Sequence, residues 1–198
     1  MVRRMKRTVL LVATLGLHAC SNVQWAYTRD DYATRDQKTV KRLVLALQPL
    51  PEGNARAGSV FARVARRFVN MKREFLVRKE QVQAETLQFG SLCTDGAEGV
   101  LWLEPDLKPE GTGFRGTVEG RLLRCPDARE VWCGKASGFV AAADEGLASV
   151  ADTYAKEFGD DARRYVAPAL NLMRPLLERL PNPILSEEDV TEKMSLDE

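Results

Sequence analysis

Histidine is almost absent from this sequence, and its scarcity limits the chemistry that we expect. The single histidine among the 198 residues is His18, which lies in an N-terminal segment with the features of a cleaved signal. Without that segment no imidazole remains for a Ser-His-Asp or Cys-His nucleophile, an HExxH zinc site or a histidine general base. The sequence therefore excludes the histidine-dependent hydrolases and metalloenzymes.

Other cofactor signatures are missing as well. The four cysteines contain no CxxC pair that could seed a zinc site. The sequence has no GxxxxGK[ST] loop, and we interpret the glycine-rich "GTGFRG" as a turn. We therefore expect no cofactor, metal or nucleotide site.

The chain also lacks an excess of either charge. It carries 29 basic and 28 acidic residues, and segment 1–19 holds four of the basic residues and none of the acidic ones. Removal of that segment leaves 25 basic against 28 acidic residues, a net charge of −3. This balance gives no general argument for nucleic acid as a partner.

No apolar run is long enough to cross a membrane as a helix. The longest, "TVLLVATLGL" over residues 8–17, falls far short of the roughly 20 residues that a span requires. Four basic residues precede this run, and small Ala19 follows it, which together predict a secretory signal. The alternatives for Cys20, which comes next, are a chance cysteine after an ordinary signal or a lipidation site.

The residues "LHAC" resemble the bacterial lipobox, with Leu17 at −3, Ala19 at −1 and the modified cysteine at +1. The resemblance implies cleavage before Cys20, a diacylglyceryl thioether on its sulfur and acylation of the new amino terminus. Several acyl chains together give stable anchoring in a membrane. Under the sorting rule of enteric bacteria, Ser21 after the cysteine directs the protein to the outer membrane, on its periplasmic face.

The sequence divides into four parts. Residues 1–19 form the cleaved signal, and residues 20–38 are polar and predict a lipid-anchored tether that reaches at most about 60 Å. Residues 39–180 predict a periplasmic α/β domain, and 181–198 a proline-containing tail with a short helix that Ser186 and Asp189 cap. The tether contains Trp25 and Tyr27, for which contact with the membrane interface and packing on the domain remain alternatives.

Hydrophobic periodicity predicts the elements of the domain. Residues 39–51 and 75–80 read as strands, and the intervening 54–75 as an amphipathic helix, which together form a right-handed parallel β-α-β unit. A short helix over 82–92 follows. Residues 98–105, 111–125 and 130–142 predict an antiparallel three-strand meander, and 144–159 and 161–180 predict terminal helices. The predicted fold class is α/β, a mixed sheet with helices packed on it.

The predicted helix over 54–75 carries a basic stripe of Arg56, Arg63, Arg66 and Arg67. A solvated helix face is the commoner interpretation of such a stripe, and a phosphate-binding face is the alternative. With the lipobox in front, the order of elements looks like the periplasmic α/β domains of the curli-channel and penicillin-binding-protein-activator lipoproteins. The segments "FVNMKREFLV", "CTDGAEGVLWL", "YVAPAL" and "LPNPILSEEDVTEKMSL" resemble an uncharacterised family of Gram-negative lipoproteins. These resemblances imply a location in the cell envelope and a fold, but they imply no catalytic activity.

Two classes of function remain. In the first, the protein is a lipid-anchored, non-catalytic binding or scaffolding module of the cell envelope. In the second, it is an envelope hydrolase that uses carboxylates alone, with Glu104, Asp106 and Glu119 as candidates. The commoner interpretation of these three residues is that they are solvated. A deep cleft that holds two facing carboxylates would favour the enzyme, and a shallow surface with an exposed sheet edge or helix groove would favour the binding module.

Three cysteines remain outside the lipidation site, in a compartment where disulfides persist. If residues 98–105 and 111–125 are antiparallel about a turn near Pro109, residues whose numbers sum to 218 lie opposite each other, and Cys93 and Cys125 fulfil this condition. A bridge between them closes a loop of about 30 residues and contributes on the order of 3–4 kcal/mol. Cys133 is then the free thiol.

Overall fold

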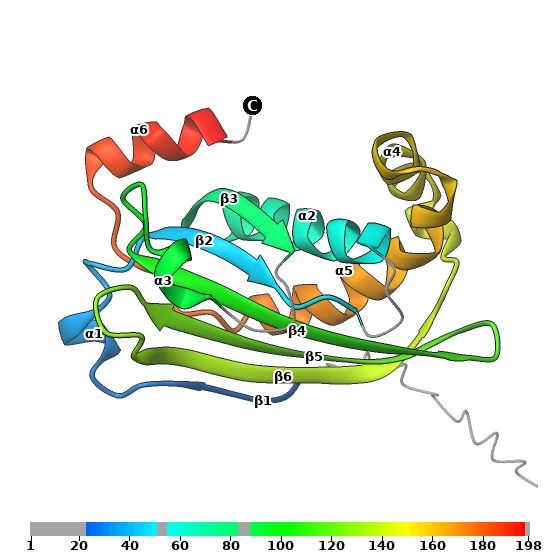
Figure 1. Cartoon of the computed structure of the whole chain (residues 1–198), viewed down its shortest axis with the longest axis horizontal. Helices are drawn as coiled ribbons and strands as arrows, with labels where there is room; N and C mark the ends of the chain where they lie inside the picture. Colours follow the sequence, from blue (N-terminus) through cyan, green and yellow to red (C-terminus); the bar gives the residue numbers. More distant parts are fainter. Residues whose placement is uncertain (1–22, 51–54, 83–87, 197–198) are drawn as a thin grey trace, which may run out of the picture.

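Helices cover one face of a six-stranded mixed sheet in this protein (Figure 1). The computed structural model describes residues 23–50, 55–82 and 88–196. In that part of the chain no helix has the length and apolar character of a membrane span. The strands lie in the order β1-β6-β5-β4-β2-β3. In chain order the helices and strands are β1 (Val23–Thr28), α1 (Tyr32–Arg35), β2 (Arg42–Leu47), α2 (Ala55–Lys72), β3 (Leu76–Val82), α3 (Phe89–Leu92), β4 (Gly99–Glu110), β5 (Gly113–Arg124), β6 (Glu130–Ala141), α4 (Ala148–Phe158), α5 (Arg163–Leu177) and α6 (Glu187–Leu196).

The predicted β-α-β unit is confirmed in β2, α2 and β3. The two strands are parallel, and β2 also pairs in parallel with β4. The last five residues of β2 are buried, because α2 covers one face of the strand and a small apolar cluster around Trp102 covers the other. A continuous apolar run such as "LVLAL" is typical of a strand with both faces covered. Part of the predicted helix over 82–92 lies outside the described residues, and α3 accounts for its end.

The predicted meander is confirmed in β4, β5 and β6, each of which is longer than a typical strand. β4 continues to Glu110, whereas the sequence predicted that it ends at Pro105. The reason is that β2 pairs with β4 only as far as Leu103, and beyond that residue β4 is an edge strand. Proline is tolerated on an edge because no neighbouring strand needs its missing N–H.

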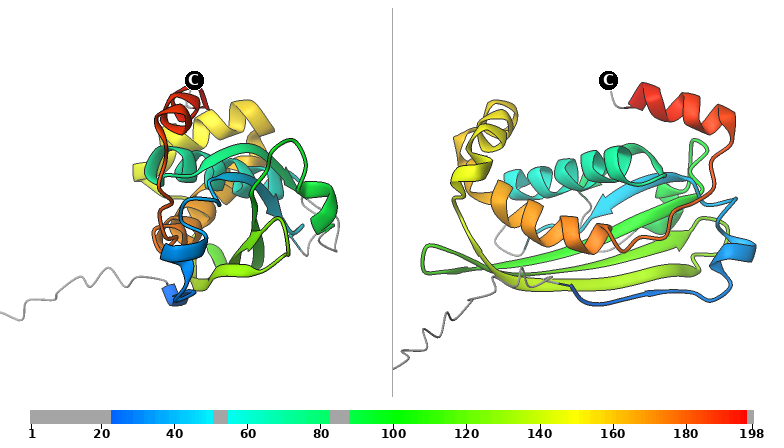
Figure 2. Two further views of the ribbon diagram at one scale, coloured as in Figure 1. Left: turned by 90° about the vertical axis from the view of Figure 1, so that its left-hand side faces the viewer. Right: turned by 180° about the vertical axis from the view of Figure 1, so that it is seen from behind.

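The core between sheet and helices is built around Trp132, whose side chain is fully buried. Gly120 and Gly134 lie directly opposite each other on β5 and β6, and a Cβ atom on either would come within 3.2 Å of the indole. These two glycines therefore leave room for the ring beneath α5. In Figure 2, α2 and α5 lie side by side across this face of the sheet.

The prediction of a tether over residues 20–38 is wrong for the described residues 23–38. β1 pairs antiparallel with β6 along its length, with Ala26 opposite Gly134 and Thr28 opposite Trp132. The chain then turns through α1 into β2. The folded domain therefore already includes Val23 and does not start at residue 39.

A buried carboxylate explains why this polar segment folds onto the domain. Asp36 is fully buried, and its two oxygens accept from Arg124 (3.2 Å) and from Arg129 at the turn between β5 and β6. Arg129 also binds Asp31 at 2.7 Å, and this hydrogen bond is the main cause that lowers the pKa of Asp31 to about 2. Asp31 and Asp36, which suggested a solvated tether, instead form ion pairs with the arginines at the turn between β5 and β6.

The C-terminal tail is also held against the domain. Ser186 and Asp189 form the predicted reciprocal cap of α6, in which each backbone N–H meets the other side chain. The Asp189 carboxylate is buried and binds Lys41 at 2.5 Å and Arg42 at 2.6 Å. Burial alone would raise the pKa of Asp189, but the bonds from Lys41 and Ser186 hold it well below its ordinary value. Ion pairs therefore fasten α6 beside β3.

We expect Asp36→Asn to lower the free energy of unfolding by about 3 kcal/mol, because two largely buried guanidinium groups lose their shared countercharge. Urea denaturation followed by circular dichroism measures the change. Asp30→Asn is the matched control, since Asp30 is exposed and a surface change of this kind stays within about 0.5 kcal/mol. Equal stability of the two variants would contradict the role that we assign to Asp36.

Candidate functional site

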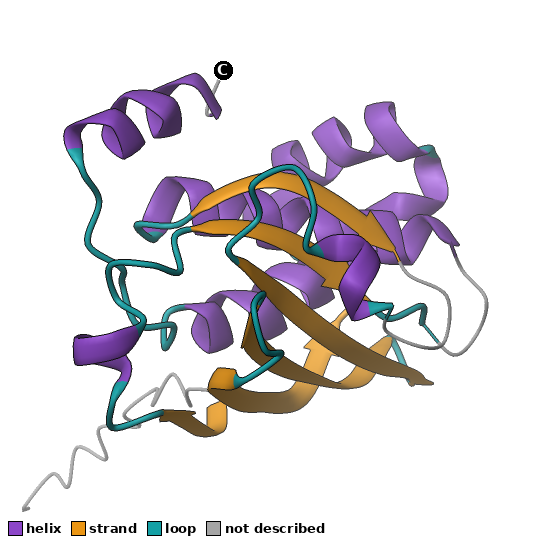
Figure 3. Ribbon diagram, turned by 60° about the vertical axis from the view of Figure 1, so that its left-hand side comes forward, coloured by secondary structure: helices purple, strands orange, loops and turns teal. Residues whose placement is uncertain are grey.

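The face of the sheet opposite α2 and α5 is the candidate functional surface, and we name it the open face. On this side α3, with the loop that follows it, lies over β2 and the start of β4 (Figure 3). Because side chains alternate along a strand, the register fixes which residues project here. They are Trp25, Tyr27, Glu104, Asp106, Lys108, Glu110, Arg115, Thr117, Glu119, Arg121, Cys133, Lys135, Ser137 and Phe139.

The structure brings together two of the three candidate catalytic carboxylates. Glu104 on β4 lies directly opposite Glu119 on β5, and Asp106 lies opposite Thr117 in the next outward pair. Lys135 on β6 binds Glu119 at 2.7 Å, and Arg121 lies 3.5 Å from Glu104. The solvated interpretation of Glu104 and Glu119 is therefore too simple, because both belong to a ladder of alternating charges.

The surroundings of this pair suit an ion-pair ladder better than an acid–base pair. A glycosidase needs one carboxylate that can give up or take a proton beside the substrate, within a site that encloses the sugar. Glu119 is hydrogen-bonded to Lys135, and Arg121 lies 3.5 Å from Glu104, whose buried Oε2 has no hydrogen bond. Neither carboxylate lines the hollows beside α3, between α4 and α5 or beside β1. The hydrolase hypothesis required two facing carboxylates in a deep cleft. Glu104 and Glu119 face each other, but they lie on a strand surface rather than in a cleft.

One of the hollows, of about 60 Å³, lies between β2, β3 and the α3 loop. Arg42 and Arg78 line it, but both are bound to Glu192, and Arg42 also binds Asp189. A second, apolar hollow of about 430 Å³ lies between α4 and α5. Three acidic residues line the second hollow, of which Asp144 accepts the backbone N–H of Gly146 and Asp152 pairs with Arg163.

The basic stripe of α2 is occupied by acidic partners. Arg63 and Arg66 both bind Glu80 on β3, at 2.7 and 2.6 Å, and Arg56 binds Asp161 at 2.7 Å. Arg67 lies over the ring of Tyr154. The stripe therefore joins α2 to β3 and α4 by ion pairs, while Arg56 and Arg67 stay about half exposed, in keeping with the solvated face that the sequence favoured. It also disfavours the phosphate-binding alternative, because an anion would have to displace these carboxylates.

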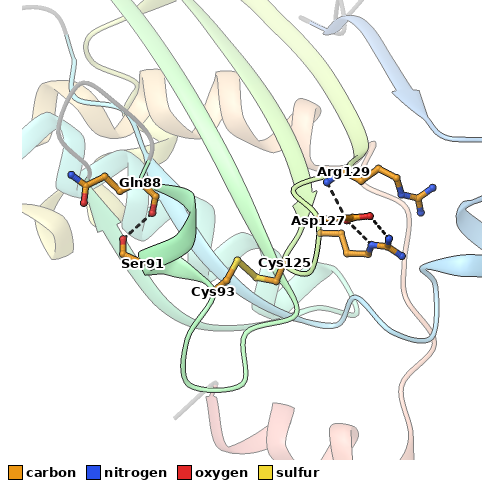
Figure 4. Close-up of a disulfide and its surroundings, with 7 residues drawn as sticks. Gln88, Ser91, Cys93, Cys125, Asp127 and Arg129 are labelled. Atoms are coloured by element: carbon orange, nitrogen blue, oxygen red, sulfur yellow. Dashed lines mark hydrogen bonds and ion pairs between the residues drawn. A yellow bond between two sulfur atoms is a disulfide. The ribbon is translucent and has the colours of Figure 1, made fainter.

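The predicted cysteine pair is joined, although the register used to deduce it is wrong. The structure links Cys93 to Cys125 with 5.4 Å between their Cα atoms (Figure 4). Gly99 lies opposite Arg124, so the hairpin turns at residues 111–112 and not near Pro109. The pair still forms because the chain before β4 turns back at Gly96, whose φ is +77°. Cys20 lies outside the described residues.

Among the cysteines that the structure describes, Cys133 is free, and it lies on the open face between Tyr27 and Arg121. Burial raises the pKa of its thiol to about 11, and the nearby Glu130 contributes in the same direction. With two cysteines joined, no group of three or more potential metal ligands exists within residues 23–50, 55–82 and 88–196.

The sequence analysis named Trp25 and Tyr27 but missed the strand that presents them, and it missed Phe139. Trp25, Tyr27 and Phe139 are 47%, 52% and 48% exposed. The first two alternate with polar or small residues in "QWAYT", and this period of two is the signal that would have identified a strand.

We expect Cys133 to react with iodoacetamide about 100-fold more slowly than a free cysteine at pH 8, because only the thiolate reacts and the raised pKa keeps it scarce. The rate should rise about tenfold per pH unit up to pH 10 and level off only above about pH 11. Mass spectrometry of the alkylated peptide over a pH series measures it, and Glu130→Gln should raise the rate at pH 8. A rate equal to that of a free thiol would contradict the assigned environment.

Comparisons with known proteins found distant structural similarity alone. No family model and no curated protein sequence matches the chain. The chain is similar to a PelC dodecamer from Paraburkholderia phytofirmans, with 13% identity, coverage of 66% of this chain and 90% of that one, and a TM-score of 0.37. It is similar to lipoprotein GNA1162 from Neisseria meningitidis, with 12% identity, 59% and 96% coverage and a TM-score of 0.37.

A third similar structure is a putative neuraminyllactose-binding hemagglutinin homolog from Helicobacter pylori, with 10% identity, 80% and 92% coverage and a TM-score of 0.29. None of these similarities is high enough to support a family or an activity. The function of the chain is therefore argued from its own residues.

Proposed function

We propose that the protein is a lipid-anchored, non-catalytic module of the cell envelope that binds another envelope protein through its open face. The anchor is the lipid on Cys20, and the module is held on the periplasmic face of the outer membrane. The lipobox-like "LHAC" and the serine at position 21 support this address.

The observation that carries the binding role is the composition of the open face. Charged side chains of both signs pair across neighbouring strands, as Lys135 does with Glu119 and Arg121 with Glu104. Helices cover the opposite face and leave this one to solvent. A broad mosaic of paired charges suits recognition of a protein of complementary pattern, because such charges give specificity and register.

The alternative, a carboxylate-dependent envelope hydrolase, has one observation in its favour, which is that Glu104 faces Glu119. The cations bound to both side chains and the open strand surface oppose it. The binding module is therefore the function that we assign.

The anchor is tested by Cys20→Ser. We expect this variant to lose palmitate labelling and to leave the membrane fraction or retain its signal, because serine offers no sulfur for the thioether. Labelled palmitate followed by electrophoresis measures the lipid, and Cys133→Ser is the control that should label like the wild type. Undiminished labelling of Cys20→Ser would overturn the proposed anchor.

The binding surface is tested by site-specific photo-cross-linking in intact cells. A photoreactive phenylalanine analogue replaces Thr117, at the centre of the open face, or Lys72, which is exposed on α2. We expect a discrete protein adduct from position 117 that is absent from position 72. No adduct from the open face, or the same adduct from both positions, would contradict the proposed surface.

A further inference from the structure

The folded domain begins very close to the proposed lipid. Only Ser21 and Asn22 separate Cys20 from Val23, the first residue of β1. Three residue steps of 3.3–3.6 Å span at most about 11 Å. If Cys20 carries the lipid, the start of β1 therefore lies within that distance of the bilayer interface. This step rests on the proposed function.

Exposed aromatic side chains border the point where the chain enters β1. Trp25 and Tyr27 project on the open face from β1, opposite Lys135 and Cys133 of β6. Phe139 projects on the same face four residues along β6 from Lys135, beyond the end of β1. All three rings are about half exposed, although large apolar groups are usually covered in a folded domain. We name these three residues the aromatic rim.

The charges of the open face do not favour an electrostatic partner for the rim. Four cations project there and each has an acidic neighbour on the same face, so the pairs cancel. The pairs are Lys135–Glu119, Arg121–Glu104, Arg115–Glu110 and Lys108–Asp106. Attraction to an anionic lipid surface needs an excess of Lys and Arg, which this face lacks.

Tryptophan and tyrosine favour the interfacial region of a bilayer, because an apolar ring and a polar group occupy one side chain. A covalent anchor within about 11 Å makes the contact intramolecular and raises its effective concentration, so even a weak contact is populated. We propose that the aromatic rim rests in the headgroup region of the membrane that holds the lipid of Cys20. This contact fixes the orientation of the domain and leaves β4 and β5 accessible to a protein partner.

The sequence contains a built-in reporter for this contact. Of its three tryptophans, Trp102 and Trp132 are 5% and 0% exposed, whereas Trp25 is 47% exposed. The lipoprotein is purified from membranes, its N-terminal lipid is verified by mass spectrometry, and it is reconstituted in phosphatidylethanolamine–phosphatidylglycerol vesicles that contain brominated lipids. Bromine quenches indole fluorescence on contact.

We expect brominated lipids to remove most of the emission of Trp25, and Trp25→Phe to abolish the quenched component. The matched control is Met71→Trp in the Trp25→Phe background, which places an exposed indole on α2 and should stay unquenched. Quenching should persist at high salt and in vesicles of phosphatidylcholine, because the contact is aromatic rather than ionic.

Three results would overturn the inference. The first is quenching of Trp25 that does not exceed that of Met71→Trp. The second is quenching that vanishes without phosphatidylglycerol. The third is protection of Trp25 from acrylamide without quenching by brominated lipid, which would indicate a protein contact. A missing N-terminal lipid would instead defeat the proposed function itself, so the two failures are distinguishable.

Discussion

A single buried carboxylate determines how this protein relates to its anchor. Asp36 receives guanidinium groups from Arg124 and Arg129, at the two ends of the turn between β5 and β6. An unpaired carboxylate could not stay in that position, because the cost of removing a charge from water exceeds most other local contributions. The pairing holds α1 and the residue that follows it against this end of the sheet, next to β1, which pairs with β6 as the edge strand.

The two faces of the sheet differ in what covers them, and this difference follows from the position of β1. Trp132, seated over Gly120 and Gly134, and the helices α2 and α5 fill one face and supply the core. The other face gains β1 and the rings of Trp25 and Tyr27 beside its charge ladder, while the disulfide secures the small cluster at the start of β4. A surface that is covered neither by helices nor by a long tether is available both to the membrane and to a partner.

Local pattern predicted much of this fold. The period of α2, the apolar run of β2 and the turn-separated strands of the meander are each encoded within short segments, and all three predictions are confirmed. Pairing between distant segments was not accessible in the same way. The composition of residues 21–38 is the same whether Asp36 faces water or pairs with Arg124. The sequence therefore predicted a tether where the structure has a segment that ion pairs hold to the domain.

The cysteines show the same limit. The prediction that Cys93 pairs with Cys125 required only that both cysteines lie at the same end of the sheet, so it was correct despite an error in register. The register itself depends on the turn at Gly111, whose φ is positive, and was predicted wrongly. The sequence could not show that Glu104 faces Glu119, because this depends on the register of β4 and β5. It could not show their cations either, because Arg121 and Lys135 come from β5 and β6.

Hydrogen exchange over residues 23–36 tests the central claim most directly. If this segment belongs to the sheet, the β1 amides that bond to β6 exchange slowly in the full-length protein, and the free-edge amides exchange quickly. Asp36→Asn should remove the protection from β1 and leave that of β4 and β5 in place. Uniformly fast exchange throughout residues 23–36 of the unmodified protein would show that the segment is a tether and would contradict this account.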